Sequence, residues 1–111
     1  MVLYVMRFNI LPDKVDKYNK WIDNYYRLTL AVRGVVELRG YRTLASSQGH
    51  VVVTYEFKNM GTWAKWRSHK EITKFLDELS KLVTNMTFEL WGPSPIVPEP
   101  IRPENNSVNQ D

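Results

Sequence analysis

Cysteine is absent from this sequence of 111 residues. Its absence excludes disulfide bonds, zinc–thiolate centres, iron–sulfur clusters and thiol nucleophiles. Histidine is scarce, with only His50 and His69, so we expect no metal site built from several imidazoles of one chain. No apolar run approaches the roughly 18 residues that span a bilayer, and the N-terminal residues show no secretory leader. These absences predict a cytoplasmic protein with no membrane partner.

The residues that are present suit one globular domain. Hydrophobic residues make up 43% of the chain and charged residues 24%, which are ordinary fractions for a folded protein. The net charge of +3 comes from basic residues that are interspersed with acids, as on an ordinary solvated surface. No helix-turn-helix, RNP or zinc-finger pattern accompanies the positive charge. We therefore expect no nucleic-acid partner.

Periodicity predicts four strands and two helical stretches. Apolar residues repeat at every second position, as in half-buried strands, over residues 3–10, 35–44, 50–57 and 84–91. They repeat at helical spacing over residues 12–33 and 59–82. The order β-α-β-β-α-β predicts an α+β, ferredoxin-like domain with a four-stranded antiparallel sheet and both helices on one face.

A few residues predict where these elements begin, bend and end. Gly34 suits the position just after the end of a helix, and Gly40 suggests a bulge or a close backbone approach in the second strand. Residues 46–49 are the predicted turn of a hairpin. Asn59 is a candidate cap for the second helical stretch. The S-x-x-E pattern that begins at Ser68 predicts a break there and a new helical start.

The sheet face opposite the helices needs a cover. Large residues occur on both sides of each predicted strand, and an exposed apolar face is unfavourable in water. A second copy of the same sheet is the simplest cover, so the sequence predicts a homodimer with twofold symmetry. Residues 1–91 form the predicted domain. Residues 92–111 hold five of the six prolines, and we expect an extended tail without regular structure.

Aromatic residues are abundant, at 13% of the chain. Those of the helical stretches can face those of the sheet across a cleft that would hold a small aromatic or hydrophobic molecule. They are Trp21, Tyr25, Trp63 and Trp66 on the helices and Tyr41, Tyr55 and Phe88 on the strands. The alternative is that these side chains only fill the core.

Three polar side chains are candidates for the same cleft, namely those of Arg7, Asn9 and His69. An imidazole has a pKa near neutrality, so His69 could act as a base or bind an anion. The alternative is that His69 is an exposed residue in the first turn of the helix that begins near Ser68.

Three segments together carry a family resemblance. They are the strand-to-helix entry at residues 7–12, the strand start at residues 34–36, and the strand end at residues 55–57, which is followed by Trp63, Trp66, Ser68 and His69. Over residues 1–91 the sequence resembles the antibiotic-biosynthesis-monooxygenase (ABM)-like members of the dimeric α+β barrel superfamily. The resemblance implies a homodimer whose sheets pack into a barrel, with a pocket between sheet and helices in each subunit. Members include cofactor-independent oxygenases of phenolic or quinol substrates and haem-degrading enzymes.

The haem-degrading branch can be compared residue by residue. That branch uses an Asn on the first strand, a Trp on the second helix and a His about three turns later. Trp66 fits the Trp position, but Leu76 stands three turns on, and Arg7 occupies the strand position with Asn9 two residues later. Without that histidine, an iron would lack its usual proximal ligand. We therefore expect no cofactor, and a haem-binding or haem-degrading role ranks third.

The leading hypothesis is a small-molecule enzyme of the ABM-like type, a monooxygenase that acts on a phenolic or quinol-like compound. In such chemistry the carbanion of the substrate reacts with oxygen, and the protein supplies a dry pocket, a base and an anion stabiliser. His69 is the candidate base, Arg7 the candidate enolate stabiliser and Asn9 an orienting group. A non-catalytic small-molecule binding or sensing dimer is the alternative, and a purely structural dimer with a filled core is also open.

Overall fold

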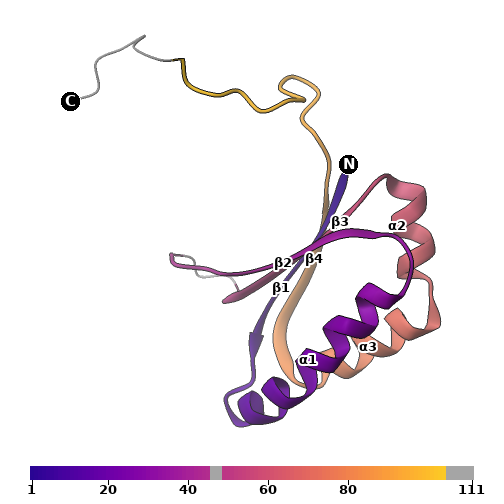
Figure 1. The fold of residues 1–111 in the computed structure, drawn as a ribbon. Coiled ribbons are helices and arrows are strands. Elements are labelled where there is room, and N and C mark those ends of the chain that lie inside the picture. The colour runs from indigo at the N-terminus through magenta and orange to yellow at the C-terminus, as the bar shows by residue number, and fades with distance from the viewer. Residues whose placement is uncertain (46–48, 105–111) are drawn as a thin grey trace.

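The computed structural model describes residues 1–45 and 49–104. Over these ranges the chain follows the predicted order of strands and helices (Figure 1). The elements are β1 (Val2–Ile10), a short 3-10 helix η1 (Pro12–Lys14), α1 (Val15–Ala31), β2 (Val35–Arg42), β3 (Val51–Phe57), α2 (Met60–Arg67), α3 (Lys70–Ser80) and β4 (Val83–Trp91).

The strands form one antiparallel sheet in the order β2-β3-β1-β4. β1 is central, and its Tyr4 pairs with Tyr55 of β3 and with Leu90 of β4. The helices α1, α2 and α3 all cover the same face of this sheet (Figure 1). The predicted ferredoxin-like fold is thus confirmed, and the other face of the sheet carries no helix in the described part of the chain.

The predicted break in the second helical stretch is confirmed, but its cap is one residue later than expected. Ser68 has helical backbone angles and closes the last turn of α2, where its Oγ donates to the carbonyl of Lys65 at 3.1 Å. His69 has the extended backbone that an N-cap needs, and its Nδ1 accepts a hydrogen bond from the backbone N–H of Glu71 at 3.1 Å. The cap predicted at Asn59 is confirmed, because its side chain accepts from the backbone N–H of Thr62.

Glycine has a clear role at two positions and none at a third. Gly34 follows α1 with a φ of +131°, which favours glycine. A Cβ on Gly49 would meet the backbone nitrogen of Phe8 at 2.7 Å, so only glycine fits there. The bulge or close approach predicted at Gly40 is wrong, because Gly40 pairs regularly with Val53 and a Cβ there would meet no atom within 4 Å. Residues 46–48 of the predicted hairpin turn are outside the described residues.

The core lies between the sheet and the helix layer. Alternate residues of β1 and β3 face it, and α3 contributes an apolar stripe, as helical spacing predicts. Its members from these elements are Tyr4, Met6, Phe8, Val53, Tyr55, Phe57, Ile72, Phe75, Leu76 and Leu79. Burial of each such large apolar side chain contributes about 1.5–3 kcal/mol to folding.

The C-terminal segment leaves the domain at the end of β4. Residues 92–104 form neither helix nor strand and are exposed along their whole length, and Figure 1 shows this segment reaching away from the sheet. The radius of gyration is 17.0 Å, against about 13 Å for a compact chain of this length. Ile96 is 87% exposed and Ile101 80% exposed.

Candidate functional site

A groove crosses the helix layer where the end of α1 meets α2 and the start of α3. Its volume is about 630 Å³, which lies within the usual range for a small-molecule site. The lining residues are Leu28 and Ala31 from α1, Val32 and Arg33 directly after it, Thr62 and Lys65 from α2, and His69 and Glu71 from the start of α3. The groove thus includes His69, one of the predicted catalytic side chains.

The groove combines apolar walls with a surplus of positive charge. Arg33 and Lys65 bring two cations, and Glu71 brings the one carboxylate of the lining. Neither cation forms an ion pair with any residue that the structure describes. Sequence reasoning missed Arg33 and Lys65. That both line one groove depends on how the end of α1 packs against α2, and periodicity does not report that geometry.

His69 enters the groove as the cap of α3, and the capping bond sets its chemistry. Its Nδ1 accepts the backbone N–H of Glu71. A ring nitrogen that accepts a hydrogen bond carries no proton, so the neutral imidazole holds its proton on Nε2. The remaining ring nitrogen therefore donates rather than accepts. This arrangement suits the stabilisation of an anion better than the role of base that the sequence suggested.

Arg7 and His69 lie on opposite faces of the sheet. Arg7 stands between Met6 and Phe8, which both face the helix-side core, so its side chain points to the open face. Asn9 has a structural contact of its own, because its Oδ1 accepts the backbone N–H of His50 at 2.7 Å. The structure does not bring these three predicted site residues into one cleft.

Two of the predicted pocket walls are core residues. Trp66 is 1% exposed and Tyr55 0% exposed. Both have hydrogen-bond partners, because Trp66 Nε1 donates to the carbonyl of Thr29 at 3.0 Å and the Tyr55 hydroxyl lies 2.9 Å from Thr29 Oγ1. Burial also raises the pKa of Tyr55 well above its ordinary value. These contacts favour the core interpretation for this pair.

Trp21 and Tyr25 form a second aromatic group on the outer part of the helix layer. Their rings stack at 4.5 Å, and Trp21 also stacks on Phe75 at 5.5 Å. Trp21 Nε1 donates to Glu78 Oε2 at 3.0 Å. Hydrogen bonds from Tyr25 and Trp21 hold the pKa of Glu78 below its ordinary value. The hollow beside Trp21 is only about 180 Å³, which is small for an organic ligand.

Trp63, another of the predicted pocket-lining residues, has an indole N–H without a partner among the described residues. This Nε1 is buried. Its ring packs at 5.6 Å from that of Tyr4, which stacks at the same distance on Phe88 of the edge strand β4. Burial raises the pKa of Tyr4, and a hydrogen bond with Arg67 partly offsets this rise.

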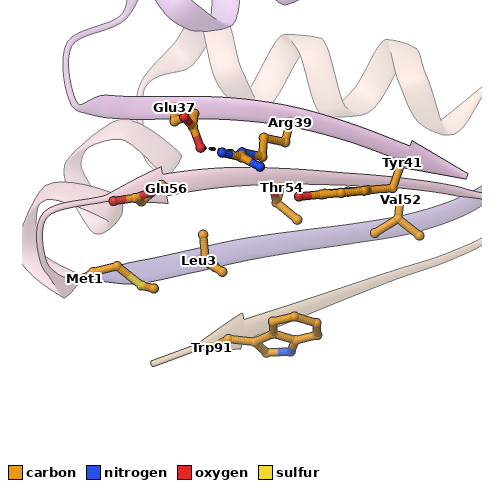
Figure 2. Close-up of a pocket in the computed structure, with 9 residues that line it drawn as sticks. All are labelled: Met1, Leu3, Glu37, Arg39, Tyr41, Val52, Thr54, Glu56 and Trp91. Atoms are coloured by element: carbon orange, nitrogen blue, oxygen red, sulfur yellow. Dashed lines mark hydrogen bonds and ion pairs between the residues drawn. The ribbon is translucent and has the colours of Figure 1, made fainter. Parts of the chain in front are cut away.

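Tyr41 lies in a different hollow, on the open face of the sheet. This hollow has a volume of about 370 Å³. Figure 2 shows Tyr41 reaching from β2 toward Thr54, with Trp91 on β4 at the opposite side. Arg39 and Glu37 form an ion pair of 2.6 Å at its rim. Tyr41 is 50% exposed and Trp91 44% exposed, so this face presents large side chains to solvent.

The described residues place further limits on the site. Within residues 1–45 and 49–104, no group of three or more Asp, Glu or His side chains is arranged to hold a metal ion. In the same part of the chain, every helix is too short or too polar to cross a membrane.

Comparison with solved structures places this fold among known ones. A dabb family protein with a ferredoxin-like fold from Mesorhizobium loti matches with a TM-score of 0.74 and 14% sequence identity, over 84% of this chain and 96% of that one. A protein named antibiotic biosynthesis monooxygenase matches with a TM-score of 0.70 and 14% identity, over 86% of this chain and all of that one. The fold is that of the ABM-like proteins.

A second match named as an antibiotic biosynthesis monooxygenase covers more of the chain. It is a candidate antibiotic biosynthesis monooxygenase from Deinococcus radiodurans, with a TM-score of 0.71 and 17% identity over 95% of this chain and 100% of that one. No family model and no curated protein matches the sequence. At this level of identity the ABM-like likeness concerns the fold, and activity has to be argued from the site.

Proposed function

We propose that this chain is a homodimeric small-molecule enzyme of the ABM-like type that oxygenates a phenolic or quinol-like compound without a cofactor. The observation that carries the proposal is the groove of about 630 Å³, which joins apolar walls to three donors, His69, Arg33 and Lys65. Phenols and quinols have an apolar body and an oxygen that becomes an anion. The fold that the chain shares with proteins named as monooxygenases supports the same reaction class.

The donors of the groove would act on the substrate rather than on oxygen. Nearby positive charge and an imidazole N–H stabilise a phenolate or enolate and lower the pKa of the substrate hydroxyl. The electron-rich carbon of that anion then reacts with molecular oxygen. In this scheme the protein binds, orients and stabilises the anion, and it shields it from side reactions.

The atoms and electrons of this reaction balance without a further reactant. In the keto tautomer of the phenol or quinol, a methylene carbon takes one oxygen atom of molecular oxygen and becomes a carbonyl carbon. Its two hydrogens leave with the other oxygen atom as water. The electrons that the carbon loses are the electrons that reduce the oxygen molecule, so the scheme needs no external reductant.

A homodimer is part of the proposal, and the open face of the sheet supports it. This face carries Leu3, Val52, Tyr41 and Trp91 around one hollow. A second copy of the same face would remove these apolar and aromatic groups from water in a twofold arrangement. The charged rim of Glu37, Arg39 and Glu56 provides polar groups for such an interface.

Oxygen uptake tests the activity directly. Oxygen consumption is followed with a panel of anthrones and naphthohydroquinones, with and without the protein, and the product is identified by mass spectrometry. We expect one oxygen molecule consumed for each ketone or quinone formed, with one oxygen atom inserted into that product and water rather than hydrogen peroxide released. A His69→Asn variant keeps a capping side chain and loses the imidazole, so its rate should fall at least about tenfold, the size of one charge-assisted hydrogen bond. If uptake is no faster with protein than without it for the whole panel, the enzymatic proposal is wrong, and ligand binding alone would make the chain a binding or sensing protein.

A further inference from the structure

The helix-layer groove has an unequal distribution of charge and apolar surface. Leu28 and Ala31 stand at i and i+3 on α1, so they share one face of that helix, and Val32 follows as its C-cap with an extended backbone. Arg33 follows directly, and Lys65 comes from the neighbouring α2. An apolar body and an anionic group would thus find complementary surfaces within the same hollow.

Glu71, the one acidic residue of the groove lining, is stabilised by its own helix. Glu71 lies in the first turn of α3, where the positive end of the helix dipole stabilises a carboxylate. Glu71 does not neutralise the positive charge of the groove, because Arg33 and Lys65 both remain without an ion pair in the described residues. With neutral His69, the formal charge of the lining is +1 from two cations and one acid.

We infer that the ligand of this groove carries a carboxylate on an aromatic or otherwise apolar body. Arg33 can meet a carboxylate with two parallel N–H groups, which a neutral hydroxyl or amide cannot exploit in the same way. Lys65 and the Nε2–H of His69 add further donors. The inference deepens the proposed function and rests on it for the reaction: the substrate class becomes a hydroxyaryl carboxylate rather than a neutral quinol.

Calorimetric titration with matched probes tests this ligand class. The probes are 3-hydroxy-2-naphthoate and 3-hydroxy-2-naphthamide, which share their rings and their hydroxyl and differ in charge. We expect the carboxylate to bind at least about tenfold more tightly than the amide, as one charge-assisted hydrogen bond requires. In Arg33→Gln and in Lys65→Gln this preference should shrink to within about threefold. In Glu71→Gln the carboxylate should bind more tightly than to the natural chain, because a like charge has been removed.

Arg27→Gln is the matched control. Arg27 is an exposed cation on α1 that pairs with Asp23 at 3.5 Å and does not line the groove. Its loss should leave the preference for the carboxylate unchanged. Equal binding of the two probes, or an equal loss of preference in Arg27→Gln and Arg33→Gln, would overturn the inference. Circular dichroism of each variant confirms that the fold is intact.

The same variants separate this inference from the proposed activity. If the naphthoate binds through Arg33 and Lys65 but no compound of the panel drives oxygen uptake, the ligand class stands and the enzymatic proposal fails. If neutral quinols drive uptake while the naphthoate shows no preference over the amide, the enzymatic proposal stands and the ligand class fails.

Discussion

His69 performs two tasks with one side chain, and they can be separated. Its Nδ1 caps α3 through the N–H of Glu71, while Nε2 is left to donate to a ligand. His69→Ala removes both functions, and the loss of the cap should lower the free energy of unfolding by about 1 kcal/mol. His69→Asn should recover most of that stability but not ligand affinity. Urea unfolding paired with titration of a bound ligand measures the two effects. Unchanged affinity in both variants would remove His69 from the site.

Trp66 is a residue of the core, and its replacement should act on stability. The ring is fully buried against Tyr55 and Phe57 at 4.9 and 5.0 Å, and its N–H is bonded to the carbonyl of Thr29. Trp66→Ala should cost about 3–5 kcal/mol, as large-to-small core substitutions do. Trp66→Phe is the control, because it keeps an aromatic ring and should cost less. Denaturant unfolding gives both values, and a cost below about 1 kcal/mol for Trp66→Ala would contradict the core assignment.

Leu76 is the residue from which we predict that the chain does not bind haem tightly. It stands where the resemblance to the haem-degrading branch would require a histidine, and it is buried in the core. Titration with haemin should therefore give no sharp Soret band at one haem per subunit. A strong histidine-type spectrum that disappears in His69→Ala would show that His69 binds iron from another position. The haem-degrading role would then rank above the cofactor-independent oxygenase.

Three tyrosines between α1 and the sheet predict a response to alkaline pH: Tyr18 and Tyr55 are buried, and Tyr26 is half-buried. Burial raises the pKa of Tyr18, Tyr26 and Tyr55. The folded chain thus keeps these protons above the ordinary tyrosine pKa of about 10, whereas the unfolded chain releases them. The stability that the neutral phenols contribute is fully present below about pH 10 and is lost as the pH rises above it.

Parallel optical titrations check this alkaline prediction. Tyrosinate absorbance and far-ultraviolet circular dichroism are recorded on the same samples. The absorbance of these three phenols should appear together with the loss of helical signal. If all six tyrosines of the chain ionise while the helical signal stays intact, the packing of α1 on β3 is not as described.

The elements themselves were largely predictable, because period two and period 3.6 report which residues face a core. The strands, the long first helix and the break between α2 and α3 follow from that signal. The cap was misplaced by one residue, because a serine before a histidine matches the capping pattern equally well when only residue types are read. Gly40 was misread, because a glycine in a strand signals a bulge only where the register shifts, and here the shift lies between Val35 and Glu37.

The candidate site was less predictable than the fold. The strand pattern places Arg7 on the face of the sheet opposite Phe8. It does not say which of the two faces the helices cover. The aromatic residues Tyr55 and Trp66 have the same sequence signature whether they line a pocket or fill a core. The groove beside His69 depends on how the end of α1 is placed beside α2, which is a tertiary property with no signal in a single sequence.

At the scale of the whole molecule, the central claim is that this ABM-like fold works as a homodimer that holds a small molecule. Native mass spectrometry of the purified protein tests both parts in one measurement. We expect a species of twice 13.1 kDa that releases a small aromatic or hydrophobic acid on collisional activation. A stable monomer of 13.1 kDa with no releasable molecule would contradict the account.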